Sequence, residues 1–135
     1  MALTAAAGPI SNIIMAFIGA LLHQIFSAIF TAFPASTQFS ANLQFAVIML
    51  LAYFHTLNLS LGLFNLIPVP PLDGSRIFYV FLPPKFYFGI MKYEHYIQMV
   101  LMVLLWTGIL TTPLSYAVSF LSGLMVKLIQ LLPFI

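Results

Sequence analysis

The stretch NLIPVPPLDGS, Asn65 to Ser75, separates an apolar, uncharged half of the chain from the half that carries every charge. Its three prolines and one glycine prevent a regular helix through its middle. Its acid, Asp73, is the first charged residue of the chain. Only 4% of the 135 residues are charged and 63% are hydrophobic, which excludes a soluble monomer and indicates a membrane protein.

Apolar stretches on both sides of this break approach the length of about 20 residues that crosses a bilayer. The expected spans are residues 9–33, 42–64, 96–112 and 114–132. Pro9 is expected in the first helical turn of the first span, and Pro113 is expected to separate the last two. A short helix from Asp73 to Leu82 follows the break. The predicted fold class is an all-α membrane protein, a polytopic bundle of about four transmembrane helices with a Pro-rich break and a short helix after the second span.

The cations predict how this single membrane domain, residues 1–135, is oriented. Three of them lie between the second and third spans: Arg76, Lys85 and Lys92. The two short connectors carry none, and Lys127 lies near the end of the fourth span. The four expected spans indicate a multi-pass protein of the cell membrane. Because cytoplasmic loops carry the excess of Lys and Arg, its N- and C-termini and the interfacial segment 76–95 are expected in the cytoplasm.

Small and polar residues recur at three- and four-residue steps along the first span, so they share one helix face. They are Gly8, Asn12, Ala16, Gly19, Ala20, His23 and Ser27. Such a stripe allows another helix to approach closely and to form hydrogen bonds across the contact. A sharper interpretation is that its first turns, Gly8 to Asn12, also border a polar site.

Composition restricts the chemistry further. Four cations are too few for a nucleic-acid surface, and without cysteine a metal would be held by His, Asp, Glu or backbone oxygen. A carboxylate within a bilayer costs roughly 2.5 kcal/mol or more, so Asp73 calls for a metal, a proton or a cation as partner. Alternatively, Asp73 caps the short helix. Asn65 either caps the broken backbone or donates its amide to an oxyanion or an extended substrate beside Asp73.

Two motifs carry a resemblance to a known family. AGPISN, Ala7 to Asn12, followed by NLIPVPPLDG, Asn65 to Gly74, resembles the site-2 proteases, zinc metalloproteases that cut peptide bonds within or beside the membrane. The likeness covers essentially the whole chain as the C-terminal half of a short bacterial-type member. It implies that Asp73 is a zinc ligand, that Asn65 engages substrate, and that Gly8 and Asn12 pack close to the catalytic helix. Ser75 stands where members often have a second glycine.

The family's two other zinc ligands and its general base come from an HExxH motif on an earlier helix, and this chain contains no HExxH. Two histidines four residues apart reach one metal from one helical face. His23 and His55 are expected far from Asp73 along their helices, in packing or interhelical hydrogen bonds. Glu94, the sole glutamate, and His95 are expected to be solvated.

The leading hypothesis is therefore the C-terminal portion of a zinc-dependent intramembrane metalloprotease, inactive by itself. Its expected partners are membrane-protein or peptide substrates, the lipid bilayer and the missing N-terminal HExxH helix, with no nucleic acid. A non-catalytic membrane scaffold of the same family is the first alternative. A small ion or proton transporter that uses Asp73 is the second.

Overall fold

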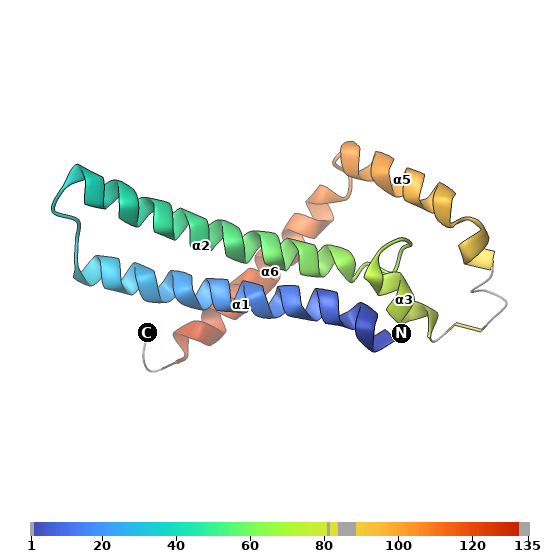
Figure 1. Ribbon diagram of the computed structural model, residues 1–135, viewed down its shortest axis with the longest axis horizontal. Coiled ribbons are helices and arrows are strands. Elements are labelled where there is room, and N and C mark those ends of the chain that lie inside the picture. The colour runs from blue at the N-terminus through green and yellow to red at the C-terminus, as the bar shows by residue number, and fades with distance from the viewer. Residues whose placement is uncertain (1, 81, 84–88, 133–135) are drawn as a thin grey trace.

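The structure is a computed structural model, and it describes residues 2–80, 82–83 and 89–132. The described residues form helices joined by turns and contain no strand, so the predicted all-α class is confirmed. The helices, labelled as in Figure 1, are α1 (Ala2–Ala32), α2 (Gln38–Asn65), α3 (Asp73–Tyr79), α5 (Glu94–Trp106) and α6 (Thr111–Gln130).

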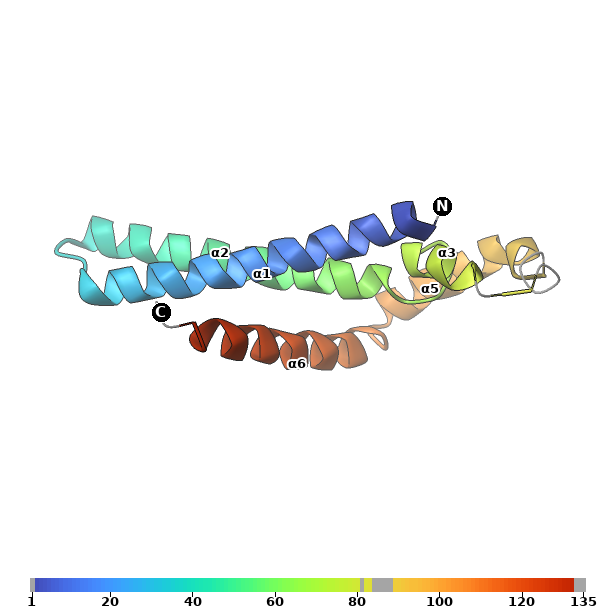
Figure 2. The same ribbon diagram turned by 90° about the horizontal axis from the view of Figure 1, so that it is seen from below.

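Helices α1 and α2 lie side by side and antiparallel along most of their length (Figures 1 and 2). Two glycines allow this approach. A Cβ added at Gly19 would stand 2.8 Å from Cδ1 of Phe54, and one added at Gly62 would stand 3.2 Å from the carbonyl oxygen of Pro9. Ala16 and Gly19 are buried in the contact. The small-residue stripe predicted on the first span is therefore a packing face, as expected.

The first helix begins earlier than expected. Residue 2, not Pro9, is its first described residue, and Pro9 lies inside the helix. A proline there removes one backbone hydrogen bond. Pro9 is fully buried beside Gly62, and this packing offsets the lost bond. The expectation that Pro9 occupies the first turn was wrong, because the three small alanines before it continue the helix.

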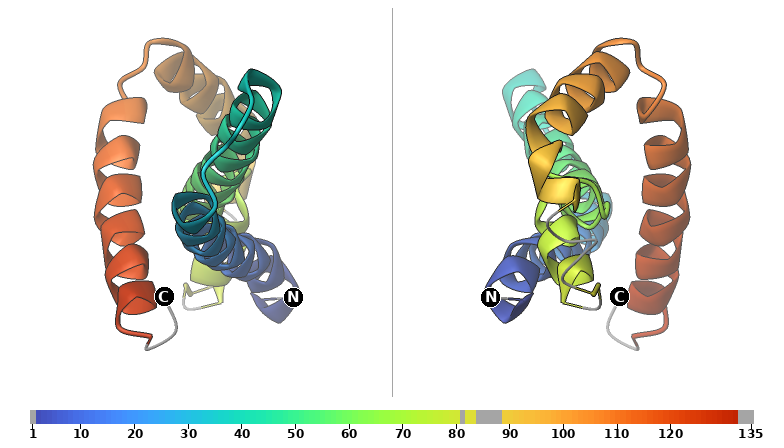
Figure 3. Two further views of the ribbon diagram at one scale, coloured as in Figure 1. Left: turned by 90° about the vertical axis from the view of Figure 1, so that its left-hand side faces the viewer. Right: turned by 90° about the vertical axis from the view of Figure 1, so that its right-hand side faces the viewer.

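Helix α6 packs obliquely across the α1–α2 pair (Figure 3). The three helices meet in a small core of Ala16, Leu59 and Val118. Beside this core, Nδ1 of His55 lies 2.8 Å from the carbonyl oxygen of Ala16, and Nε2 lies 2.8 Å from Oγ of Ser122. One buried side chain on α2 thus links α1 to α6, which confirms the predicted interhelical hydrogen bonding of His55.

The boundary between the last two helices differs from the prediction. Helix α5 ends at Trp106, and Gly108 follows with a positive φ of 77°. Glycine adopts this left-handed conformation without steric cost and commonly terminates a helix. Pro113 does not form the break, because it lies in the first turn of α6, where a missing N–H needs no partner.

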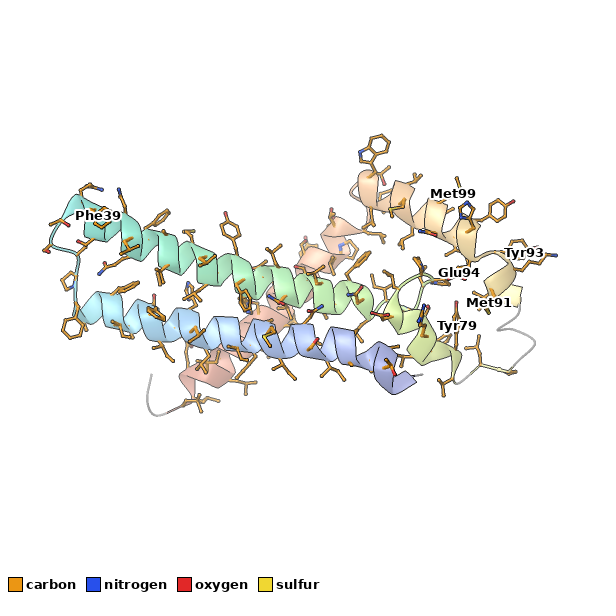
Figure 4. The ribbon with its side chains drawn as sticks, viewed as in Figure 1. Phe39, Tyr79, Met91, Tyr93, Glu94 and Met99 are labelled. Carbon is orange, nitrogen blue, oxygen red and sulfur yellow. The ribbon has the colours of Figure 1, made fainter. Side chains whose placement is uncertain are left out.

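Three described helices are long and apolar enough to cross a membrane: α1, α2 and α6. Helix α5 has 13 residues, fewer than the expected span 96–112 and fewer than the roughly 20 needed. Large apolar side chains point outward along these helices, among them Phe39, which is 78% exposed (Figure 4). Such an exterior is typical of a protein whose surroundings are lipid.

The short helix after the break starts at Asp73 as predicted and ends at Tyr79, three residues before the predicted end at Leu82. Its last carbonyls still bind in a turn, since the N–H of Leu82 donates to the carbonyl of Tyr79 at 3.2 Å. Part of the predicted interfacial segment 76–95, namely residues 81 and 84–88 with Lys85, lies outside the described residues.

Candidate metal and substrate site

The proline-rich break folds back on the end of α2. The N–H of Leu66 still bonds to the carbonyl of Gly62 at 3.2 Å, and a turn then closes from the N–H of Leu72 to the carbonyl of Val69 at 2.9 Å. Because prolines donate no hydrogen bond, the loop is held by the few N–H groups that remain. The predicted interruption after the second span is confirmed, and it places the start of α3 beside the end of α2.

Gly74 fixes this fold-back. A Cβ at this position would overlap the carbonyl oxygen of Leu66 and would lie 2.6 Å from the carbonyl oxygen of Ile67. Both obstacles are backbone atoms, which cannot move aside as a side chain does. The glycine of the Leu-Asp-Gly motif is therefore required by the approach of α3 to the loop.

Asp73 is the first residue of α3, and it is half-buried. The residue at the N-cap is Leu72, which makes no side-chain capping bond. The alternative interpretation, in which Asp73 caps the short helix, was therefore wrong. Ser75 does not cap the helix either, because its Oγ donates to the carbonyl oxygen of Leu72 at 2.7 Å and accepts no bond from a first-turn N–H. Ser75 closes the first turn, and the Asp73 carboxylate is left for another partner.

The first motif supplies the wall against this carboxylate. A Cβ added at Gly8 would lie 3.2 Å from Oδ2 of Asp73, so α1 approaches the carboxylate with bare backbone. Asn12 lies one turn further along α1 and packs on α2, where its Cβ is 3.4 Å from the position of a Cβ on Gly62. The structure thus brings Gly8 to Asp73 and places Asn12 in the α1–α2 contact.

A cavity of about 720 Å³ opens beside Asp73 where α1 begins. Its lining includes Thr4 and Ala5 of α1, Asp73 and Arg76 of α3, Met91 before α5, and Glu94 at the start of α5. Its volume is in the range of about 300–1,000 Å³ that is usual for ligand sites. Both acids of the chain therefore border one cavity at one end of the helix pair.

Glu94 was expected to be solvated, and the structure places it at the wall of the open cavity. Glu94 is half-buried and faces the cavity, whereas its neighbours Tyr93 and His95 are exposed. Figure 4 shows Glu94 and Met91 on the side toward α3 and Tyr93 pointing away from it. The residues around Glu94 are charged and aromatic, and no pattern in their sequence indicates which of these side chains faces α3.

Asn65 is the last residue of α2, and it is half-buried. It immediately precedes Leu66, whose carbonyl packs on Gly74, so the two ends of the second motif are close in space. The described residues that line the cavity do not include Asn65. Its predicted contact with substrate stays a prediction.

The described side chains supply one fitting metal ligand. Among them, no group of three or more His, Asp or Glu residues is close enough to hold a metal ion. Both ring nitrogens of His55 are already engaged in hydrogen bonds, which rules that residue out as a ligand in this arrangement. A half-buried carboxylate at the edge of a cavity suits zinc, which takes Asp oxygen together with His nitrogen. Asp73 therefore fits the chemistry of a zinc ligand, but the described residues do not provide a complete metal site.

A membrane-embedded helical protein with a lone carboxylate at a broken helix is the class that these features define. Residues 1–108 match Peptidase family M50, so the chain belongs to this family of membrane metallopeptidases, as its resemblance to site-2 proteases predicted. It is 42% identical over 103 residues to a Bacillus subtilis (strain 168) protein named "Putative zinc metalloprotease YwhC". That match covers 76% of this chain and 44% of the relative, so the chain spans less than half of the relative's length. No solved structure matches the chain.

Proposed function

We propose that residues 1–135 form part of a zinc-dependent intramembrane protease that hydrolyses peptide bonds of membrane-protein substrates. The observation that carries this proposal is the position of Asp73, half-buried at the edge of a cavity and bordered by the bare backbone of Gly8. Family membership and the named relative support the same chemistry. The likeness to the family further suggests that an HExxH segment, absent from these residues, completes the site.

Three residues of this chain, Asp73, Gly8 and Asn65, have a part in the proposed reaction. A carboxylate oxygen of Asp73 holds the metal, and Gly8 keeps the space beside it free of side chain. When bound, zinc supplies Lewis-acid chemistry that polarises a scissile carbonyl and activates water. The amide of Asn65 donates to the backbone of the substrate. The HExxH segment contributes two histidine ligands and a glutamate that accepts a proton.

We also propose that the N-terminus and residues 76–95 face the cytoplasm of a cell-membrane protein. Arg76 lies on α3 next to the start of α1, and Lys92 lies just before α5, so two cations lie toward the same end of the helix pair (Figure 1). Cytoplasmic ends carry such cations preferentially. The predicted cytoplasmic C-terminus, which Lys127 alone favoured, is not proposed, because a chain with the three spanning helices α1, α2 and α6 has its two termini on opposite sides of the membrane.

Asp73→Asn tests the proposed ligand in a protease that contains both the HExxH segment and residues 1–135. Because the amide has lost the charge that binds the metal, we expect zinc affinity and cleavage of a membrane substrate to fall at least about 100-fold. Zinc is measured by competition with a chromogenic chelator. The control is Asn58→Ala on α2, where the amide donates only to the carbonyl of Phe54. Normal zinc content and cleavage in Asp73→Asn would refute the assignment.

A further inference from the structure

The cavity beside Asp73 carries a second acid whose role the proposed zinc chemistry does not use. Glu94 comes from the start of α5 and faces the wall that α3 provides. It is half-buried, so its charge is less screened by water than that of an exposed side chain. Within the part of the chain that the structure describes, no ion pair joins Glu94 to a cation.

Arg76 is the one described cation on the cavity wall, and it differs from Glu94 in its surroundings. Arg76 lies on α3 and is exposed, whereas Glu94 is half-buried. Water therefore weakens the field of Arg76 inside the cavity more than that of Glu94. Asp73 is the third charged residue of the lining, and the proposed function assigns its carboxylate to the metal; Met91 and Val80 are among the uncharged remainder. A long aliphatic side chain with a cationic end matches apolar stem contacts together with the partly buried carboxylate of Glu94.

We propose that Glu94 gives the protease a preference for substrates with a lysine or arginine that enters this cavity next to the scissile bond. This inference rests on the proposed proteolytic function, because it takes Asp73 to mark the position of the reaction. Asp73 and Glu94 line one cavity, so a peptide held at Asp73 presents a neighbouring side chain to Glu94. Glu94 acts as a specificity residue and takes no part in the bond cleavage.

Binding, measured without cleavage, separates this inference from the proposed reaction. The probes are three fluorescent peptides with one apolar segment, identical except for Lys, Gln or Glu at a single flanking position. They are titrated by anisotropy, in zwitterionic detergent, against the purified 135-residue chain that carries Asp73→Asn, so that Glu94 is the one acid left in the chain. We expect the Lys peptide to bind about fivefold more tightly than the Gln peptide, and the Glu peptide to bind most weakly.

Two variants of Glu94 and one matched control complete the test. Glu94→Gln should bind the Lys and Gln peptides equally, and Glu94→Lys should prefer the Glu peptide. Gln130→Lys raises the net charge by the same one unit as Glu94→Gln, at the exposed end of α6, and should keep the preference for Lys. Absence of binding, equal binding of the three peptides, or a Lys preference that survives in Glu94→Gln would overturn the inference. These binding outcomes do not depend on zinc content or on cleavage, so a failure of the proposed proteolytic function is measured separately.

Discussion

Gly8 on α1 and the carboxylate of Asp73 on α3 lie so close together that they leave no free space for a side chain at position 8, although the two residues are far apart in the sequence. A Cβ at Gly8 would lie 3.2 Å from Oδ2 of Asp73, closer than the 3.4 Å at which ordinary van der Waals contact begins. The glycine of the first motif therefore determines how much room the carboxylate of the second motif has. The first motif and the second motif therefore meet at this point of the structure. The absence of a side chain at Gly8 explains how the carboxylate of Asp73 fits there.

Gly8→Ala is the most direct test of this contact. The added methyl group requires the carboxylate to shift by a few tenths of an ångström. Zinc sites tolerate ligand shifts of only about 0.2 Å, so zinc affinity should fall roughly tenfold in a protease that also contains the HExxH segment. The fold should persist, because alanine favours a helix more than glycine does. Chelator competition measures the affinity, and circular dichroism measures the helix content.

Gly123→Ala is the matched control for this variant. Gly123 is also inside a transmembrane-length helix, α6, and a Cβ there meets nothing within 4 Å. The same chemical change should leave zinc affinity at the wild-type value. If Gly8→Ala behaves like Gly123→Ala, the close contact with Asp73 has no effect on the site.

Gly74→Ala should disturb the structure itself. The new Cβ would overlap the backbone carbonyl of Leu66, so α3 must move away from the loop. Overpacking of this kind costs about 1–3 kcal/mol, and it should appear as a lower unfolding temperature of the 135-residue chain in detergent. The loop between α2 and α3 should also become more sensitive to added protease. A melting temperature equal to that of Gly123→Ala would contradict this account.

The break, the short helix and the packing face could be predicted because each depends on residues close together in the sequence. Three prolines within four residues, Pro68, Pro70 and Pro71, prevent a regular helix at that point of the chain. Small residues at helical spacing identify a contact face without knowledge of the partner. The end of α5 was predicted at the wrong residue. Gly108 is a single glycine in an apolar run and gives a weak signal, whereas Pro113 was taken as the break although it lies in the first turn of α6.

The site was predicted less completely, because its geometry depends on how distant elements meet. The position of Asp73 follows from its motif, and the approach of Gly8 follows from the antiparallel α1–α2 pair. The inward orientation of Glu94 depends on the direction in which α5 leaves α3, which no local pattern specifies (Figure 4). The same holds for Ser122, since only the crossing of α6 brings its hydroxyl to His55.

Gly108→Ala tests whether this glycine ends α5. An alanine at a φ of 77° is strained by roughly 1 kcal/mol, and the chain can relieve the strain only by changing the turn between α5 and α6. We expect a lower unfolding temperature and a changed distance between spin labels placed at Trp106 and Thr111. Gly89→Ala, where a Cβ has nothing within 4 Å, should change neither quantity. An unchanged label distance in Gly108→Ala would mean that the turn does not depend on the glycine.

The link from α2 to α6 is tested by a double-mutant cycle on His55 and Ser122. Nδ1 of His55 lies 2.8 Å from the carbonyl of Ala16, which only accepts, so Nδ1 carries the proton. In the neutral imidazole, Nε2 then accepts from the hydroxyl of Ser122. Hydrogen bonds between membrane helices average about 0.6 kcal/mol, and this coupling is expected between His55→Leu and Ser122→Ala. Unfolding free energies of the reconstituted chain provide the measurement.

His23→Leu with Ser122→Ala is the control pair for this cycle. His23 is half-buried on α1, and no hydrogen bond is seen for it among the described residues. The two free-energy changes should therefore add within about 0.3 kcal/mol. Additivity for His55 and Ser122 as well would show that their 2.8 Å contact contributes nothing to holding α6. A coupling confined to the His55 pair would instead establish that one buried imidazole holds three helices together, at a distance from the zinc chemistry proposed for Asp73.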